Sequence, residues 1–389
     1  MDFQDLKKLD EKFVLQTYGR YPLELVRGSG CKVWDSEGKE YLDMLGGIAC
    51  LPLGHAHPKL VKAIREQAEK LMHVSNLYYM ENQARLAEML SDLAPLKTKA
   101  FFSNSGAEAN EAAIKFARKN TKRSEIIAMS NSFHGRTMGS LAITDKKKYQ
   151  KPFEPLMPET EFVEYGSIES LKNAINGDTA AVFVEFVQGE GGIRFPKDGL
   201  GETIEYIKGI REACDDSGAL MVMDEVQTGV GRSGKFFACE HAGIAPDIIT
   251  TAKGIASGFP MGVTLVSEDI ASSIEKGDHG STFGGGPLAC AAGIATVETI
   301  LDGKLMENAA KVGKHLLGQS DFGKARGLGL MIGVDVGTED KAKSILKEAR
   351  SRGVLVNVTA QSIIRMLPPL ILTKREADFA VGHLREAAK

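Results

Sequence analysis

The chain has 389 residues, and 42 of them are glycine, about 11% where roughly 7% is usual. Hydrophobic residues make up 43% and charged residues 25%, and the glycines follow no Gly-X-Y period, so collagen-like and disordered classes are excluded. The net charge is -3, from 48 basic and 51 acidic residues, which argues against a nucleic-acid-binding protein. The glycine excess instead indicates positions where the backbone needs unusual freedom or lies close to a ligand.

The N-terminal stretch, the apolar runs and the cysteines indicate the cellular compartment of the protein. The N-terminal stretch as far as Phe13 has no apolar signal-peptide core. Apolar runs such as residues 180–184 fall well short of the roughly 18 residues that a membrane helix needs. Five widely spaced cysteines without a CxxC pair favour reduced thiols over a disulfide framework or structural zinc. We therefore predict a cytoplasmic protein that binds neither membranes nor nucleic acids.

The predicted elements begin with a hairpin in the first 50 residues, formed by 32–35 and 40–42 around a turn at 36–38. From about residue 99 onward, short apolar runs alternate with helical patterns, as in layered α/β folds. The strands predicted for this part are 100–103, 125–129, 180–187, 219–223, 247–250 and 262–266. Most are continuously apolar, which is typical of strands buried on both faces of a mainly parallel sheet.

Past residue 286 the pattern changes to a smaller α+β region. It is predicted to contain a long helix at about 288–301, a second helix, a strand at 328–336, a third helix, strands near Val354 and Ile363, and a final helix. We expect three parts: an N-terminal segment (1–50) that joins the small domain, a large domain (51–290) and a C-terminal small domain (291–389).

The first motif that could carry chemistry is SNSGAEANE (103–111), where a strand leads into a helix. Ser105 at the N-cap and Glu108 three residues later form a capping-box pattern. Ser105, Gly106 and Ala107 would present backbone N–H groups at the positive end of the helix, which suits a phosphate. A plain helix cap is the commoner meaning of such a motif taken alone.

Three further motifs follow later strands. Asp224 ends an apolar strand, and a buried carboxylate needs a partner such as the protonated pyridine nitrogen of a cofactor, although it could cap a loop instead. Lys253 follows the next strand, where a partly desolvated lysine can form a Schiff base, although surface lysines are common there. The run HGSTFGGG (279–286) is either a flexible loop or a source of hydroxyl and N–H groups for a phosphate. Together, the motifs meet three requirements of pyridoxal 5'-phosphate.

Seven stretches of the sequence resemble, in the same order, those of the class III pyridoxal-phosphate-dependent aminotransferases of fold type I. They are GHAHP (54–58), NSGAEANE (104–111), FHGR (133–136), QGEGG (188–192), DEVQTGVGR (224–232), Lys253 and STFGG (281–285), within a resemblance that extends from about Tyr18 to Pro369. The resemblance implies a mainly parallel central sheet sandwiched by helices in a large domain that binds pyridoxal phosphate. It also implies a smaller α+β domain that combines the C-terminal part with the N-terminal segment.

The resemblance further implies roles for the cofactor-binding residues. Lys253 would bond the cofactor and then act as general base and acid, while Asp224 would keep the pyridine nitrogen protonated. Gln227 would hydrogen-bond the ring oxygen, and Phe133 would stack on the ring. The full implied set of cofactor contacts is Ser105, Gly106, Ala107, Phe133, Asp224, Glu225, Val226, Gln227, Lys253 and Thr282. Thr282 would come from the neighbouring subunit, which implies a homodimer with the active site at its interface.

Two arginines are implied to bind substrate carboxylates, for which their fork of donors is suited. Arg136, with Ser281 nearby, would bind the α-carboxylate of N-acetylornithine, and Arg365 that of glutamate or 2-oxoglutarate. Glu190 would pair with Arg365 while the basic donor is bound and swing away for glutamate. A strand-edge surface position is the alternative for Arg365. Tyr18 would lie near the substrate, with a place in the core as the alternative.

The implied reaction moves the δ-amino group of N-acetylornithine to 2-oxoglutarate in arginine biosynthesis. Ornithine, succinylornithine, 4-aminobutyrate and carrier-bound lysine stay open as donors. A non-catalytic dimeric scaffold of the same fold is a further alternative, which the presence of Lys253, Asp224 and Arg365 disfavours.

Four residues stand apart from these roles. Gly286 occupies a position where the family usually has Asn, which puts the rigidity of that loop in question. His55 and His57 have no third ligand at useful spacing, so we predict no metal site and assign them to the loop and its packing. His134 is expected to order the loop of Phe133.

Overall fold

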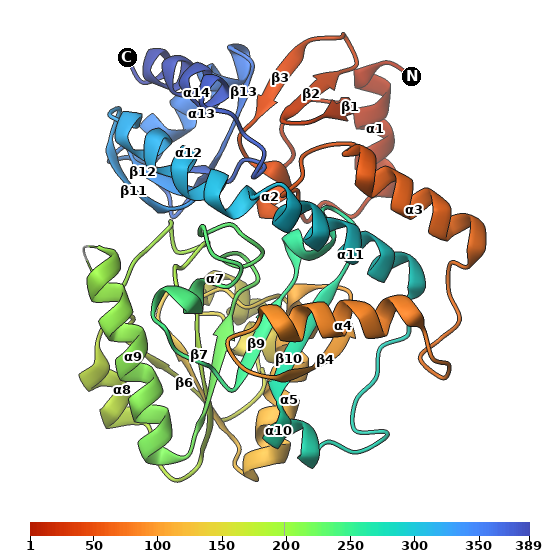
Figure 1. Cartoon of the computed structure of the whole chain (residues 1–389). Coiled ribbons are helices and arrows are strands. Elements are labelled where there is room, and N and C mark those ends of the chain that lie inside the picture. The colour runs from red at the N-terminus through yellow and green to blue at the C-terminus, as the bar shows by residue number, and fades with distance from the viewer. Residues whose placement is uncertain (198) are drawn as a thin grey trace.

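A seven-stranded sheet lies at the centre of the lower half of the molecule in Figure 1, with strand order β4-β10-β9-β8-β7-β5-β6. The computed structural model describes residues 1–197 and 199–389. The strands are β4 (Thr98–Ser103), β5 (Glu125–Met129), β6 (Thr160–Val163), β7 (Thr179–Val184), β8 (Leu220–Asp224), β9 (Ile248–Thr251) and β10 (Gly262–Ser267). All pairs from β9 to β6 are parallel, and only β10 runs antiparallel to its neighbours β4 and β9. The prediction of a mainly parallel α/β sheet is confirmed.

Alternate side chains of these strands enter two separate apolar layers. On β8, Val222 packs in the layer that includes α5 (Gly106–Thr121), whereas Met221 and Met223 pack in the layer that includes α9 (Leu200–Ser217). Both layers exclude water, which explains the continuously apolar strands. The sequence did not predict β6, because this strand has only four residues, lies at the sheet edge and has one buried residue, so it forms no continuous apolar run.

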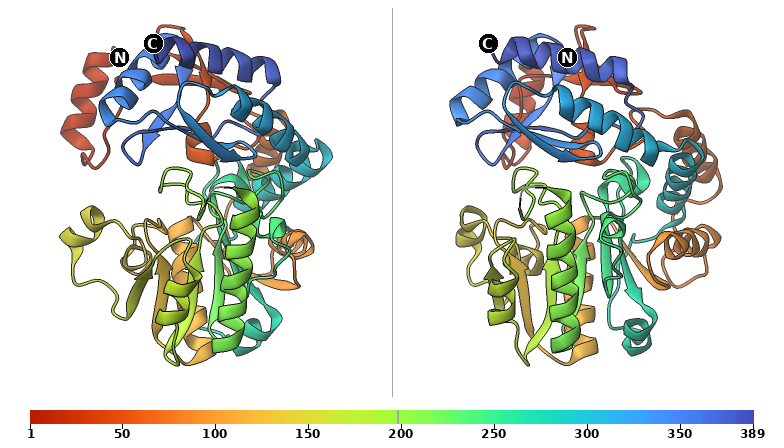
Figure 2. Two further views of the ribbon diagram at one scale, coloured as in Figure 1. Left: turned by 90° about the vertical axis from the view of Figure 1, so that its left-hand side faces the viewer. Right: turned by 60° about the vertical axis from the view of Figure 1, so that its left-hand side comes forward.

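The upper half contains two four-stranded sheets and both chain termini (Figures 1 and 2). The first sheet joins β1 (Leu25–Ser29), β2 (Lys32–Asp35) and β3 (Glu40–Asp43) to β13 (Val354–Leu355), which pairs in parallel with β3. The second contains β11 (Lys324–Leu328), β12 (Met331–Asp335), β15 (Ile363–Met366) and β14 (Asn357–Thr359). The predicted hairpin at 32–42 is confirmed. The N-terminal strands therefore lie with the C-terminal part, while the domain boundaries at residues 50 and 290 stay predictions.

The strand predicted at 328–336 corresponds to β12, which begins at Met331, but the sequence did not predict β11, which precedes it and pairs with it as a hairpin. The chain reverses at Gly329, whose φ of +57 lies in the left-handed region. A Cβ atom at this position would lie 2.3 Å from the Arg232 carbonyl oxygen, so only glycine fits the turn.

Helices complete both halves. The remaining α-helices are α1 (Phe3–Phe13), α2 (Gly46–Ala49), α3 (Pro58–Lys70), α4 (Glu81–Leu93), α6 (Met138–Ala142), α7 (Lys147–Gln150), α8 (Ile168–Ala174), α10 (Glu268–Ser273), α11 (Pro287–Asp302), α12 (Leu305–Gln319), α13 (Glu339–Ser351) and α14 (Lys374–Ala387). The 3-10 turns are η1 (Lys151–Phe153), η2 (Ala238–His241) and η3 (Lys253–Ala256). Helix α11, predicted at 288–301, packs against α3, α4 and η3. In the described part of the chain no helix is long and apolar enough to cross a membrane.

Candidate active site

Seven of the ten predicted cofactor residues line one cavity of about 260 Å³ at the carboxyl ends of the central strands. Asp224 is the last residue of β8, Lys253 opens η3 just after β9, and Gly106 begins α5 just after β4. The cavity is lined by Gly106, Ala107, Asn110, Phe133, His134, Gly135, Arg136, Glu185, Asp224, Val226, Gln227 and Lys253. Parallel strands deliver their carboxyl ends to one sheet edge, which is where open α/β sheets bind ligands.

The start of α5 forms one wall of the cavity. Ser105 Oγ accepts a hydrogen bond from the Glu108 N–H at 3.2 Å, as an N-cap does. The second half of the predicted capping box is wrong, because the Glu108 carboxylate accepts from the Asn104 N–H at 2.9 Å rather than reaching back to Ser105. A Cβ atom on Gly106 would lie 2.7 Å from Val226, so glycine is needed for this close approach. The free N–H groups of the first turn remain available to an anion.

Asp224 is almost fully buried and is held by three hydrogen bonds. Its Oδ2 accepts from Asn110 Nδ2 at 2.8 Å and lies 2.6 Å from His134 Nδ1, and its Oδ1 accepts from the Val226 N–H at 2.9 Å. Burial alone would lower the pKa of His134, but the hydrogen bond and charge of Asp224 outweigh it, so the pKa is raised. The carboxylate is therefore fixed in position beside an imidazole whose protonated form it favours.

His134 and Asn110 are site residues that the sequence did not predict. The motifs FHGR and NSGAEANE contain them, but nothing in either motif indicates that both side chains reach Asp224. Two polar atoms of this group, Asn110 Oδ1 and His134 Nε2, are buried and have no hydrogen-bond partner among the described residues. Such atoms are uncommon in folded proteins and mark a polar site that a ligand or water completes.

Lys253 lines the same cavity in a backbone conformation that is unusual for a residue with a side chain. Its φ of +43 lies in the left-handed region, and no described residue forms an ion pair or side-chain hydrogen bond with its amine. Strained conformations of this kind cost about 1–3 kcal/mol and concentrate at active sites. The lysine is thus held at the cavity without a protein partner for its amine.

Pyridoxal phosphate fits this donor set. The helix start suits its phosphate, and Phe133 and Val226 provide apolar surfaces for its ring. The fixed Asp224 carboxylate suits a protonated pyridine nitrogen, and Gln227 offers a hydrogen bond to the ring oxygen. Lys253 would supply an amine for the cofactor aldehyde.

Arg365 on β15 contacts Gln227, which lines this cavity, and is 1% exposed, so the surface alternative is wrong. Its Nη1 contacts Glu190 Oε1 at 2.5 Å and Gln227 Oε1 at 3.4 Å, while its Nε donates to Asn357 Oδ1 at 3.1 Å. Burial would raise the pKa of Glu190, but the charge of Arg365 outweighs it and the pKa is lowered. The structure thus contains the ion pair that the family resemblance implied.

Besides Ser105, Glu190 and Arg365, four predicted residues are absent from the lining of the cavity. Ser281 accepts hydrogen bonds from Asn104 Nδ2 at 3.2 Å and from the Gly284 N–H at 3.1 Å, and Thr282 is exposed. Tyr18 is 76% exposed, so its alternative place in the core is wrong.

The fourth residue, Glu225, is fully buried, but its side chain points away from the cavity. Its carboxylate accepts from Thr228 Oγ1 at 2.5 Å and from the Cys239 N–H at 2.8 Å, and burial raises its pKa to about 7. The side chain therefore holds the turn after β8 against η2.

Gly286 has no conformational need to be glycine. It is the N-cap of α11 with a φ of −61, and a Cβ atom there would lie 3.4 Å from the nearest atom, the Phe283 carbonyl oxygen. A Cβ atom is therefore accommodated at this position. His55 Nε2 contacts Asp43 Oδ2 at 2.8 Å, and no group of three potential metal ligands occurs within residues 1–197 and 199–389.

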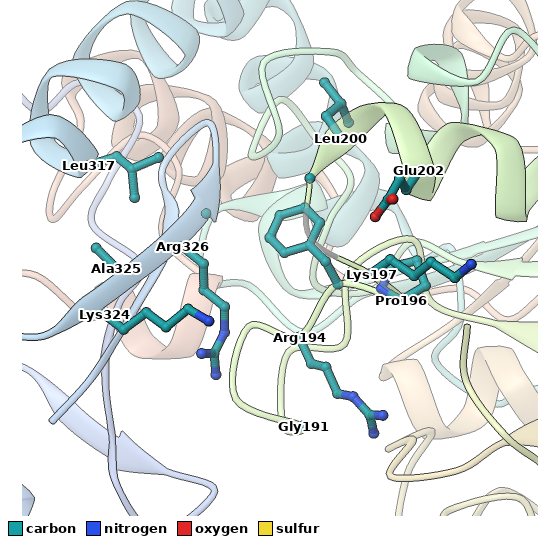
Figure 3. Close-up of a pocket in the computed structure, with 13 residues that line it drawn as sticks. Gly191, Arg194, Pro196, Lys197, Leu200, Glu202, Leu317, Lys324, Ala325 and Arg326 are labelled. Carbon is teal, nitrogen blue, oxygen red and sulfur yellow. The ribbon is translucent and has the colours of Figure 1, made fainter. Parts of the chain in front are cut away.

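A larger cavity of about 880 Å³ lies elsewhere, between the start of α9 and strand β11 (Figure 3). The cationic side chains of Arg194, Lys197, Lys324 and Arg326 line it, and none of the predicted site residues does. Its size alone does not make it the catalytic site, because it lacks the aligned lysine, carboxylate and helix start of the smaller cavity.

The fold and the site define a pyridoxal-phosphate-dependent transferase. The family model described as aminotransferase class-III matches residues 14–388. The chain therefore belongs to the class III aminotransferase family, whose members use pyridoxal phosphate.

Individual relatives are similar over nearly their whole lengths. The acetylornithine aminotransferase of Methanothermobacter thermautotrophicus is 46% identical over 99% of each chain, and that of Methanopyrus kandleri is 48% identical over 99% of each. Among solved structures, ornithine aminotransferase from Toxoplasma gondii has a TM-score of 0.94 at 29% identity and covers 100% of this chain with 95% of its own. Acetylornithine aminotransferase from Elizabethkingia anophelis has a TM-score of 0.87 at 31% identity, covering 100% and 99%.

Proposed function

We propose that this protein transfers the δ-amino group of N2-acetylornithine to 2-oxoglutarate in two half-reactions, giving N-acetylglutamate semialdehyde and glutamate. The observation that carries a two-substrate reaction is the ion pair between the buried Arg365 and the half-buried Glu190, beside Gln227 of the cavity wall. The names and high identity of the archaeal relatives support N2-acetylornithine as the donor, and with it a role in arginine biosynthesis.

Bound pyridoxal phosphate supplies an aldehyde for the amino group and an electron sink for the carbanion. Lys253 would attach the cofactor by its amine and would then move the proton as general base and acid. Asp224, oriented by His134 and Asn110, holds a proton at the pyridine nitrogen. Phe133 lines the cavity and would offer its ring face to the cofactor, excluding water there.

Each of the two arginines binds the α-carboxylate of a different substrate. Arg136 binds the α-carboxylate of N2-acetylornithine, while Arg365 stays neutralised by Glu190. When glutamate or 2-oxoglutarate enters, Glu190 swings away and Arg365 binds the α-carboxylate bidentately. One cavity thereby accepts a basic donor and an acidic acceptor.

A homodimer in the cytoplasm is part of this proposal. Five exposed apolar residues lie in the segment 71–79, namely Leu71, Met72, Leu77, Tyr78 and Tyr79. The segment contacts the loop of Thr282: Asn76 Nδ2 donates to the carbonyl oxygens of Ser281 and Gly284 at 3.2 and 2.9 Å, and the His73 and Phe283 rings lie 5.0 Å apart. Contiguous exposed apolar surface marks an interface. A second subunit covering it would receive Thr282 and Ser281 at its own cavity.

The donor is tested by mixing the cofactor-loaded protein with single donors and following the visible absorbance of the bound cofactor. The panel contains N2-acetylornithine, ornithine, succinylornithine, 4-aminobutyrate and carrier-bound lysine. We expect the highest kcat/KM with N2-acetylornithine. Failure to form the semialdehyde while another amine reacts readily would refute the assignment.

Replacing Glu190 by Gln should separate the two half-reactions. The uncharged amide no longer neutralises Arg365, so the cation repels the basic donor but stays available to an α-carboxylate. We expect kcat/KM for N2-acetylornithine to fall about tenfold, which is about 1.4 kcal/mol, and that for glutamate to hold or rise. Single-turnover rates with each donor measure this, with the exposed Glu169→Gln as the matched control. An equal loss in both half-reactions would contradict the proposed exchange of partners.

A further inference from the structure

Arg136 lines the cavity and its side chain is exposed. Its guanidinium contacts two aromatic rings. No described residue forms an ion pair or side-chain hydrogen bond with its guanidinium. The guanidinium carbon lies 3.5 Å from the centroid of the Tyr149 ring and 5.6 Å from that of Phe133. An arginine in water samples many rotamers, so this stack is what fixes the group at the cavity.

Tyr149 is itself held firmly on α7. Its N–H donates to the Lys146 carbonyl oxygen at 2.7 Å. The next residue, Gln150, is buried and its Nε2 donates to the carbonyl oxygens of Leu141 and Ala142 at 3.3 Å each. No described residue hydrogen-bonds the Tyr149 hydroxyl, so what the ring offers to Arg136 is its face.

Stacking and carboxylate binding use different parts of a guanidinium. The ring contacts the flat face, where the positive charge meets the negative face of the aromatic system. The N–H donors lie in the guanidinium plane and stay free for a bidentate carboxylate. The stack can therefore hold Arg136 and leave its recognition edge open.

We propose that Tyr149 is a positioning residue that orients Arg136 and thereby makes the enzyme selective for amino donors with a carboxylate remote from the reacting amine. This inference rests on the proposed role of Arg136. It extends the site to α7, which contributes no residue to the cavity wall.

The first test measures the stack without catalysis. Phenylglyoxal modifies accessible arginines, and peptide mass spectrometry gives the modification rate of Arg136 alone. We expect a rate at least about threefold higher in Tyr149→Leu than in the wild-type protein, because a cation–π contact of this strength is lost. Tyr149→Phe keeps the ring and should match the wild type. Equal rates in all three proteins would overturn the proposal.

The second test compares N2-acetylornithine with N-acetylputrescine, which is the same molecule without the carboxylate. In Tyr149→Leu we expect KM for N2-acetylornithine to rise about 3- to 30-fold with kcat unchanged. Values for N-acetylputrescine should stay as in the wild type, and Tyr149→Phe should restore both. The proposal would be overturned if KM rose equally for the two amines, or if KM for N2-acetylornithine did not rise. Tyr149→Met replaces the leucine variant if the latter does not fold.

The two proposals fail differently. If the wild-type protein rejects N2-acetylornithine, the proposed donor is wrong, and the comparison is made with the donor it does use and the decarboxylated analogue of that donor. If the preferred donor has no carboxylate at all, the positioning role of Tyr149 is wrong as well.

Discussion

Replacing Lys253 by Ala is expected to abolish transamination, with kcat reduced about 10⁴-fold, the upper range for loss of a positioned proton-transfer group. The same lysine attaches the cofactor, so two functions disappear together. Its amine lines the cavity at the carboxyl ends of β8 and β9, and no other lysine lines that cavity among the described residues. No other lysine of that cavity can therefore replace Lys253 as the base.

The measurement has a readout besides activity. After incubation with pyridoxal phosphate and reduction by borohydride, the wild-type peptide that contains residue 253 should have gained the mass of the reduced cofactor. The Lys253→Ala protein should show no such peptide. Lys172, which is exposed on α8, provides the matched control, since Lys172→Ala should keep both the label and the activity. Label on another lysine in the variant, or substantial remaining activity, would disprove the assignment.

Replacing Asp224 by Asn should reduce kcat about 10²- to 10³-fold, the range seen when one preorganised electrostatic partner is removed. The amide keeps the size of the side chain and its oxygen still accepts one hydrogen bond, but the negative charge opposite the pyridine nitrogen is lost. The buried His134 also loses the anion that lies 2.6 Å from its Nδ1. Steady-state kinetics on variant protein saturated with cofactor measure the effect.

The same variant makes a pH-dependent prediction about stability. The pKa of His134 is raised in the folded protein, since Asp224 outweighs the effect of burial. The pair therefore stabilises the folded state fully below the ordinary histidine pKa of about 6.5, and this contribution is lost as the pH rises through the folded value. Breaking a buried ion pair costs about 3 kcal/mol. We expect the free energy of unfolding of Asp224→Asn to fall below the wild-type value by more at about pH 6 than at about pH 9.

Denaturant unfolding at the two pH values checks this expectation, and NMR titration of His134 checks its cause. The exposed Asp178 provides the control, because Asp178→Asn should leave both the stability difference and the histidine unchanged. A deficit that is the same at both pH values would show that His134 does not depend on the charge of Asp224.

Much of the fold could be predicted from local patterns in the sequence. Strands buried on both faces of the sheet need unbroken apolar runs, so the predicted bounds of β5, β7, β8, β9 and β10 agree with the observed bounds within a few residues. The hairpin β11–β12 was missed because its turn depends on Gly329 packing against Arg232, a contact 97 positions apart in the chain that no local pattern contains.

The position of the site followed from the sequence by itself, because Gly106, Asp224 and Lys253 each lie at or just after the carboxyl end of a strand, and parallel strands end at one edge of the sheet. The family resemblance added roles to these positions. Only the tertiary structure decided how the polar groups are paired. Asp224 meets His134 from 90 positions away, and Glu190 meets Arg365 from 175 positions away.

The tertiary structure also decided which predicted residues do not line the cavity. Glu225 is adjacent to Asp224 in the sequence, yet its carboxylate is used by Thr228 and Cys239. Tyr149 was assigned a role only because its ring stacks on Arg136 in the structure, a contact that no motif indicates. Strand patterns depend on whether each residue faces water, which neighbouring residues largely determine. Side-chain pairing depends on how separate loops pack after the sheet has formed, and this physical difference divides what the sequence determined from what it left to the folded structure.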